Sequence, residues 1–167
     1  MPSNVLPDVL APDLRIVFCG TAAGTVSAAR GAYYAHPQNK FWRALHAAGL
    51  TPRLLAPAEY PLMPSFGLGL TDIAKTVSGM DKELPAGALG RLACEAMRAR
   101  IERFEPAILA FTSLTAGRRF LRHDATFGPQ EERIGRTRLF VLPSPSPAAG
   151  WNWDERWWRS LSDAAGR

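Results

Sequence analysis

The chain has 167 residues and a formal net charge of +5 at pH 7, which fits one domain, residues 1–167, with a continuous buried core. The basic excess is spread along the sequence, so by itself it favours a polyanionic partner only weakly. Two cysteines argue against a disulfide framework, and no apolar stretch has the pattern of a secretion signal or the length of a membrane span. We therefore expect a soluble, monomeric, cytoplasmic protein that does not bind membranes.

The N-terminal part predicts a lead-in followed by a buried strand. Residues 1–12 indicate an extended lead-in, and the apolar run 14–20 predicts the first strand. Gly20 and Gly24 let the backbone turn sharply beyond this strand, where α/β proteins bind their ligands. A short helical turn is expected at 26–30.

The middle of the chain predicts one helix, a long loop and a second strand. Asn39 is a favoured cap for a helix that runs to about Ala48. Four prolines between residues 51 and 64 predict a loop that wraps over the surface. The apolar run 67–73 predicts a strand, and 74–84 returns to polar loop composition.

The C-terminal part alternates helices and strands. Apolar residues at helical spacing predict a helix over 85–105, which ends before Pro106. Two further strands are predicted at 107–111 and 138–142, and two further helices at about 113–121 and 154–165. This alternation predicts an α/β fold, a three-layer sandwich whose mostly parallel central sheet is covered by helices on both faces.

One short stretch combines the groups that hold a flat heterocycle near a phosphate. Residues 33–42 supply aromatic rings, a histidine, an amide and a cation soon after the first glycine turn. Aromatic faces stack on nucleobases, and polar groups around them bind the edge of the base and the backbone. The glycine turn and this stretch together indicate a nucleobase pocket.

Four motifs occur in the order and spacing of a known family. They are Val17–Gly20, Ala35–Trp42, Gly69–Asp72 and Val141–Ser146. Over roughly residues 10–161 the chain resembles the mismatch-specific uracil-DNA and thymine-DNA glycosylases. This resemblance implies a uracil-DNA-glycosylase-like three-layer fold that binds DNA containing uracil or mismatched bases. It also implies flipping of the base and hydrolysis of its N-glycosidic bond to an abasic site, with no metal and no organic cofactor.

The first motif departs from this family at the position that aligns water. Ala22 stands where the family most often has an asparagine that positions the attacking water, and a methyl group cannot orient water. Ser144 stands where some members have asparagine, and residues 147–150 replace a stretch from which members insert a bulky wedge into the duplex. The resemblance therefore leaves the source of water activation open.

Asp72 is the candidate catalytic residue. Cleavage of the glycosidic bond develops positive charge on the sugar, so the site needs an anion or an aligned water beside it. Between Gly24 and Asp72 the one other carboxylate is Glu59, which lies in the proline-rich loop, whereas Asp72 ends a predicted strand. We predict that Asp72 positions or activates the water; the alternative is that it caps the next turn or pairs with Lys75.

The predicted base-binding residues join the glycine turn to the aromatic stretch. In the resemblance, Tyr34 aligns with the aromatic that stacks beneath the flipped base, and ordinary core packing is the alternative. Backbone amides around Thr21 and Tyr34 are expected to bind carbonyl oxygens of the base. For His36 and Asn39, a turn and a helix cap are the alternative roles. The predicted set comprises Gly20, Thr21, Ala22, Tyr34, His36 and Asn39.

The predicted DNA-binding residues follow the last strand. Ser144 and Ser146 offer hydroxyls or backbone donors to phosphate, with an ordinary turn as the alternative. Ala148 is at the wedge position of the resembling family, and Trp151 is the bulky neighbour expected to compensate for this small residue. Packing of Trp151 in the core is the alternative.

Functions of different classes remain open from the sequence. The first is a monofunctional uracil-DNA glycosylase in which Asp72 replaces the amide missing at Ala22. The second is a noncatalytic protein that binds uracil or abasic sites in DNA. A small nucleotide hydrolase is a more remote alternative, for which free nucleotides would compete with the substrate.

Overall fold

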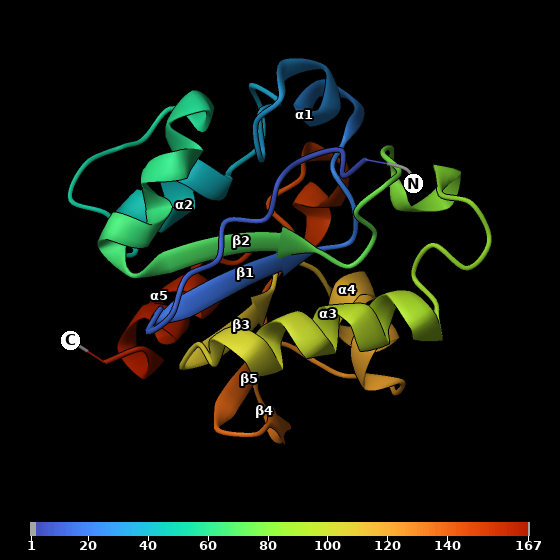
Figure 1. Ribbon diagram of the computed structural model, residues 1–167. Helices are drawn as coiled ribbons and strands as arrows, with labels where there is room; N and C mark the ends of the chain where they lie inside the picture. The colour runs from blue at the N-terminus through green and yellow to red at the C-terminus, as the bar shows by residue number, and fades with distance from the viewer. Residues whose placement is uncertain (1–2, 167) are drawn as a thin grey trace.

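A five-stranded sheet between two layers of helices forms the centre of the molecule, and the computed structural model describes residues 3–166 (Figure 1). The strand order is β2-β1-β3-β5-β4. Four strands are parallel, and the fifth pairs antiparallel at one edge, which confirms the predicted α/β class. The parallel strands are β1 (Ile16–Gly20), β2 (Leu68–Asp72), β3 (Ile108–Phe111) and β5 (Thr137–Val141), and the edge strand is β4 (Gly128–Ile134).

The parallel strands are continuous apolar runs because helices cover both faces of the sheet. Even-numbered residues of β1 pack in a cluster with α2 (Phe41–Ala47) and α5 (Glu155–Ala164). Odd-numbered residues of β1 pack in a second cluster with α3 (Arg91–Phe104) and α4 (Leu114–Leu121). Successive side chains of a strand point to opposite faces, so this alternation produces the predicted three layers.

Strand β4 is the element that the sequence analysis missed. Its central residues are polar or charged and exposed, and it pairs with β5 alone. A register shift between Pro129 and Arg133 interrupts that pairing. An edge strand needs neither an apolar face nor continuous pairing, so the segment lacks the pattern by which the other strands were predicted.

Helix α3 is shorter at its N-terminus than predicted. It begins at Arg91 instead of residue 85, because Gly87 has a positive φ of 82° and Gly90 is the extended N-cap. Its end at Phe104 agrees with the prediction from Pro106. Within residues 3–166, no helix is both long enough and apolar enough to cross a bilayer. The remaining elements are α1 (Thr25–Arg30) and the 3-10 helices η1 (Pro57–Phe66), η2 (Asp81–Glu83) and η3 (Pro147–Asn152).

The N-terminal segment lies along the outer edge of β2. Val9 and Leu70 exchange two antiparallel backbone hydrogen bonds of 2.9 Å. A Cβ atom at Gly69 would lie 2.5 Å from the carbonyl oxygen of Val9, so only glycine lets the two backbones approach this closely. Leu6, in the same segment, is buried in the core. The segment therefore packs as part of the fold.

Candidate active site

Three oxygen atoms converge above Gly20 at the carboxyl edge of the sheet. Gly20 ends β1 and is in register with Asp72 at the end of β2. A Cβ atom built on Gly20 would lie 2.7 Å from Asp72 Oδ1 and 3.4 Å from both Thr112 Oγ1 and Tyr34 Oη. Glycine is required here because any side chain would collide with the carboxylate. The predicted residues Gly20, Tyr34 and Asp72 thus come together in one polar site.

The carboxylate of Asp72 is buried, with a residue exposure of 4%. Burial raises its pKa to about 7, and the negative charge of Asp8 acts in the same direction. Lys75, Arg100 and a hydrogen bond with the backbone of Gly20 lower the pKa of Asp72 but do not offset burial. Asp72 therefore changes charge near neutral pH, as a general base at this pH requires.

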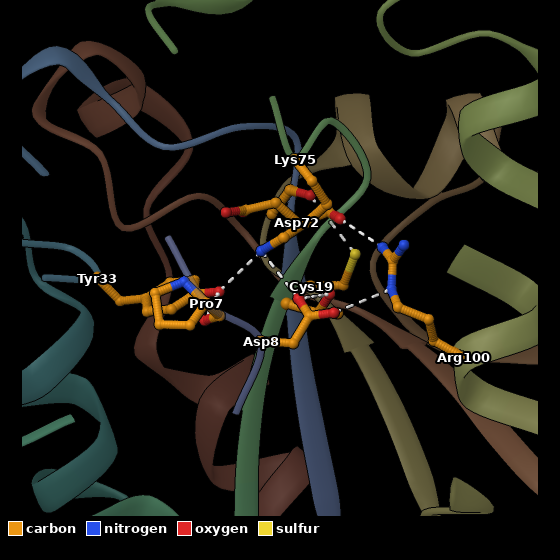
Figure 2. A network of polar contacts seen from close by, with 9 residues as sticks. Pro7, Asp8, Cys19, Tyr33, Asp72, Lys75 and Arg100 are labelled. Atoms are coloured by element: carbon orange, nitrogen blue, oxygen red, sulfur yellow. Dashed lines mark hydrogen bonds and ion pairs between the residues drawn. The ribbon is translucent and has the colours of Figure 1, made fainter. Parts of the chain in front are cut away.

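Charged side chains form a network beside Asp72 (Figure 2). Asp8 accepts a hydrogen bond of 2.7 Å from the hydroxyl of Thr71 and forms ion pairs with Lys75 at 2.8 Å and Arg100 at 3.3 Å. Arg100 also donates a 2.8 Å hydrogen bond to the backbone carbonyl of Asp72. The ion pair of Lys75 is with Asp8, which weakens the alternative that the role of Asp72 is to pair with this lysine.

Tyr34 is held as a fixed aromatic platform. Its φ of 51° is in the left-handed region, where an aromatic residue is strained. Its ring stacks on Phe41 with centroids 4.0 Å apart and an interplanar angle of 12°. Its hydroxyl is hydrogen-bonded to Thr112 at 3.0 Å, and burial together with Asp72 raises the pKa of the phenol well above its ordinary value. Both ends of this side chain are therefore anchored.

The first glycine turn is fixed to the loop that follows β2. The hydroxyl of Thr21 donates to Asp81 at 2.6 Å, and the carbonyl of Thr21 accepts a 2.7 Å hydrogen bond from Ala74. Ala22 is partly buried against the core cluster on the α3 side, and its methyl group offers no hydrogen bond. These hydrogen bonds tie the turn to the neighbouring loop, and at Ala22 the turn presents a methyl group instead of a polar side chain.

His36 and Asn39 make local bonds in the segment before α2. The ring Nδ1 of His36 accepts a 3.0 Å hydrogen bond from the backbone of Gln38. The side chain of Asn39 accepts one of 2.9 Å from the backbone of Phe41, at the start of α2. The contact of His36 corresponds to the turn role. Helix α2 has Lys40 as its N-cap, so Asn39, the predicted cap, lies one residue before the cap position and its side chain supports the turn that leads into the helix. Base binding by either residue stays a prediction.

The serines after β5 form two successive turns. Ser144 Oγ accepts a hydrogen bond of 3.2 Å from the backbone of Ser146, and Ser146 Oγ accepts one of 3.3 Å from the backbone of Ala148. The backbone of Lys40 donates to the carbonyl of Pro145 at 2.9 Å, which ties this loop to the segment before α2. The loop therefore lies beside the aromatic stretch, as a shared DNA-binding edge requires.

Trp151 and Trp158 lie in opposite environments. Trp151, on η3, has an exposure of 84%, and the neighbouring Ala148 is also exposed. Trp158, on α5, has an exposure of 1% and stacks on Phe18 at 5.9 Å. The alternative that Trp151 packs in the core is therefore wrong, and its predicted contact with DNA stays open.

Sequence reasoning missed several residues of this site. Thr112 directly follows the predicted strand 107–111, so its position at the carboxyl edge was the available signal. Arg100 reaches the backbone of Asp72, and Asp8 reaches Arg100, only through the tertiary fold. Asp81 reaches Thr21 across two loops. Their distances along the chain gave no indication of these contacts.

Comparison with known proteins agrees with this architecture. The fold is similar to the solution NMR structure of a candidate uracil DNA glycosylase from Methanosarcina acetivorans, with a TM-score of 0.66 and 20% sequence identity. That match covers 97% of each chain. The profile of the uracil DNA glycosylase superfamily matches residues 7–162, which include the glycine turn after β1, the aromatic stretch and the serine turns. The chain therefore belongs to the uracil DNA glycosylase superfamily.

Proposed function

We propose that this chain is a monofunctional uracil-DNA glycosylase of the mismatch-specific type, with Asp72 as the residue that positions or activates water. The observation that carries the proposal is the convergence of the Asp72 carboxylate with the hydroxyls of Thr112 and Tyr34 above Gly20. Family membership supports the reaction class, and this convergence supports the assignment of the residue.

The proposed chemistry is hydrolysis of the bond between uracil and deoxyribose. As the base departs with the bonding electrons, the sugar becomes electron-poor, and the ionised Asp72 stabilises that charge. A water held by this carboxylate attacks the sugar carbon, and its proton passes to Asp72. The negative charge on the departing base requires hydrogen-bond donors, for which we assign backbone amides near Thr21 and Tyr34.

Tyr34 supplies the stacking surface in this proposal. Phe41 covers one face of its ring at 4.0 Å, so the flipped uracil would rest on the opposite face. Such a stack is worth about 1–3 kcal/mol per base, which helps to offset the cost of extruding the nucleotide. The hydrogen bond to Thr112 keeps the ring from turning, so the base would be held in one orientation relative to Asp72.

The loop from Ser144 to Trp151 supplies DNA contacts in this proposal. Its serines and backbone N–H groups are suited to phosphate oxygens. The indole of Trp151 is a large apolar group left in solvent, and a flat ring of this kind can replace the extruded base in the stack. This role would compensate for the small Ala148 next to it.

A noncatalytic binding protein is the second candidate, and Ala22 is the observation that favours it. The methyl group removes the amide with which family members align water, while the stacking platform and the loops that would grip DNA are retained. Such a protein would bind uracil or abasic sites in DNA without turnover.

The decisive experiment measures abasic-site formation under single-turnover conditions, which separates chemistry from product release. The wild type, Asp72→Asn and Ala22→Asn are incubated with uracil in single-stranded DNA and opposite guanine or adenine. We expect wild-type turnover and a loss of about 100-fold or more in Asp72→Asn, because proton transfer by a positioned group contributes at least this factor.

Two controls make the result specific. Glu59→Gln removes the half-buried carboxylate of the proline-rich loop, which pairs with Arg53, and should keep full activity. Full activity of Asp72→Asn would remove that residue from the mechanism. Tight binding of abasic DNA by the wild type without any turnover would establish the noncatalytic alternative, and activity gained by Ala22→Asn would then identify the missing amide as the cause.

A further inference from the structure

The positive and negative charges of Asp72 and the side chains beside it nearly cancel. Beside Asp72 lie two cations, Lys75 and Arg100, and one further carboxylate, Asp8. With Asp72 ionised the four side chains are neutral in sum, and with Asp72 protonated they carry one positive charge. Side-chain exposures of 9% for Lys75, 22% for Arg100 and 20% for Asp8 leave the interactions only partly screened by solvent.

We propose that Asp8, from the N-terminal segment, is a positioning residue of the active site that engages Lys75 and Arg100 and so leaves the Asp72 carboxylate available to water. The proposal rests on the proposed role of Asp72, and it assigns a function to a segment that precedes the first of the four motifs, Val17–Gly20. Asp8 acts through the two cations, since its carboxylate contacts them and Thr71.

The fold places Asp8 at this position through several independent contacts. The bridge between Val9 and Leu70 fixes the segment on one side of Asp8. On the other side, Pro7 accepts a 2.9 Å hydrogen bond from the hydroxyl of Tyr33. The backbone of Val5 donates to the carbonyl of Lys75 at 2.7 Å. The segment thus runs along β2 with its acidic side chain directed at the cations, as Figure 2 shows.

If Asp8 is lost, we expect Lys75 and Arg100 to form direct ion pairs with the carboxylate of Asp72. Arg100 already donates to the backbone carbonyl of Asp72 at 2.8 Å, and Lys75 is three residues away along the chain. Without Asp8, both partly buried cations would keep only neutral hydrogen-bond partners, Tyr33 for Lys75 and the Asp72 carbonyl for Arg100, and would be drawn to the remaining carboxylate. A direct ion pair would occupy the oxygens of Asp72 that the water needs, and it would hold the carboxylate in its charged form.

The other titratable groups that face Asp72 do not supply the missing negative charge. They are the thiol of Cys19 on β1 and the phenols of Tyr33 and Tyr34 before α2. Burial raises the pKa of all three, so they stay neutral across the range in which Asp72 titrates. Asp8 is therefore the charge that opposes Lys75 and Arg100 on the pKa of Asp72.

The test is the pH dependence of single-turnover uracil excision in the wild type and in Asp8→Asn, whose amide oxygen still accepts from Thr71. In the wild type we expect the rate to rise with a midpoint near the pKa of Asp72, about 7. In Asp8→Asn we expect the midpoint to fall by about one pH unit, because two unopposed cations favour the ionised carboxylate. The rate at the plateau should also fall, since the carboxylate becomes engaged.

Two further variants test whether the negative charge of Asp8 is what sets the midpoint. Asp8→Glu keeps the negative charge on a longer side chain, so its midpoint should lie closer to that of the wild type than the midpoint of Asp8→Asn does. Asp13→Asn removes an exposed acid of the same N-terminal region and should change neither the midpoint nor the plateau. A rate that is lower at every pH in Asp8→Asn, with an unchanged midpoint, would mean that Asp8 serves only the fold and would overturn the proposal.

A readout that needs no activity distinguishes failure of this proposal from failure of the proposed function. The carboxyl carbon of Asp72 is titrated by NMR in the wild type, Asp8→Asn and Lys75→Met. We expect its midpoint to fall in Asp8→Asn and to rise in Lys75→Met. An Asp72 midpoint that moves in neither folded variant contradicts the coupling, whereas shifted midpoints in a protein without turnover contradict only the glycosylase assignment.

Discussion

The carboxyl edge of the sheet and the loop around η3 differ in how firmly they are held. At the sheet edge, Asp72 is buried, and Tyr34 is anchored at its ring and at its hydroxyl. In the loop, Ser146 makes short-range turn bonds, and Trp151 stands in solvent. Catalysis requires reacting groups that are held at fixed positions, whereas a surface that binds a bent DNA duplex benefits from conformational freedom. The contrast supports the proposed division, with chemistry in the first region and adaptable DNA contact in the second.

The largest effect on the fixed region is expected from filling the space above Gly20. In Gly20→Ala the new methyl carbon would lie 2.7 Å from the Asp72 carboxylate, so the carboxylate must move. We expect a loss of about 100-fold or more in single-turnover rate and a loss of about 1–3 kcal/mol in the free energy of unfolding. Gly24→Ala is the matched control for stability, because a Cβ at Gly24 meets nothing within 4 Å.

Two substitutions of Tyr34 test its hydroxyl and its aromatic ring separately. Tyr34→Phe keeps the ring and removes the hydrogen bond to Thr112, which should cost about 0.5–1.5 kcal/mol in stability and little in substrate binding. Tyr34→Leu removes the aromatic face and should weaken binding to uracil-containing DNA by about 1–3 kcal/mol, or roughly 5- to 150-fold. Equal binding by the two variants would show that stacking is not the role of the ring.

The pH dependence of stability tests the buried carboxylate of the first region. Asp72 has a pKa of about 7 in the folded protein against an ordinary value of 3.8, so the folded state binds its proton more tightly than the unfolded state. Its contribution to stability is therefore lost as the pH rises from about 4 to about 7, while the ionised form needed for activity accumulates. Melting temperatures should show Asp72→Asn gaining on the wild type across this window. An equal difference at all pH values would contradict the raised pKa.

The smallest effect is expected in the exposed loop. Trp151→Ala should change stability by less than about 0.5 kcal/mol, since the indole is 84% exposed. Binding to duplex DNA should fall by up to roughly 10-fold, with less change for single-stranded DNA, if the ring fills the position of the flipped base. Trp158→Ala is the contrasting variant, because removing a buried indole should cost about 3–5 kcal/mol in stability.

The sequence predicted the parts of the molecule that have a local signature. Apolar runs located β1, β2, β3 and β5, and strand ends pointed to Gly20 and Asp72 as neighbours. The polar edge strand β4 has one pairing partner and no apolar face, so its composition resembles that of a loop. Helix α3 was extended too far because the spacing of apolar residues continues through the turn before Arg91.

The charged network could not be predicted because it depends on distance in space alone. Asp8 and Arg100 are 92 positions apart in the sequence, yet they form an ion pair of 3.3 Å. Thr112 is one residue beyond a predicted strand, but the sequence does not indicate that its hydroxyl meets Tyr34. Contacts of this kind follow from strand order, which hydrophobic periodicity leaves undetermined.

The left-handed backbone of Tyr34 is maintained by the contacts of its own side chain. Glycine and asparagine adopt a φ of 51° more readily than tyrosine does, so replacement by either would relieve conformational strain. Either replacement would also lose the ring that stacks on Phe41 and the hydrogen bond to Thr112, and the lost packing of about 3–5 kcal/mol outweighs the relief of about 1–3 kcal/mol of backbone strain. A screen for survival at high temperature should therefore retain tyrosine at this position, because the side chain that strains the backbone also secures the turn before α2.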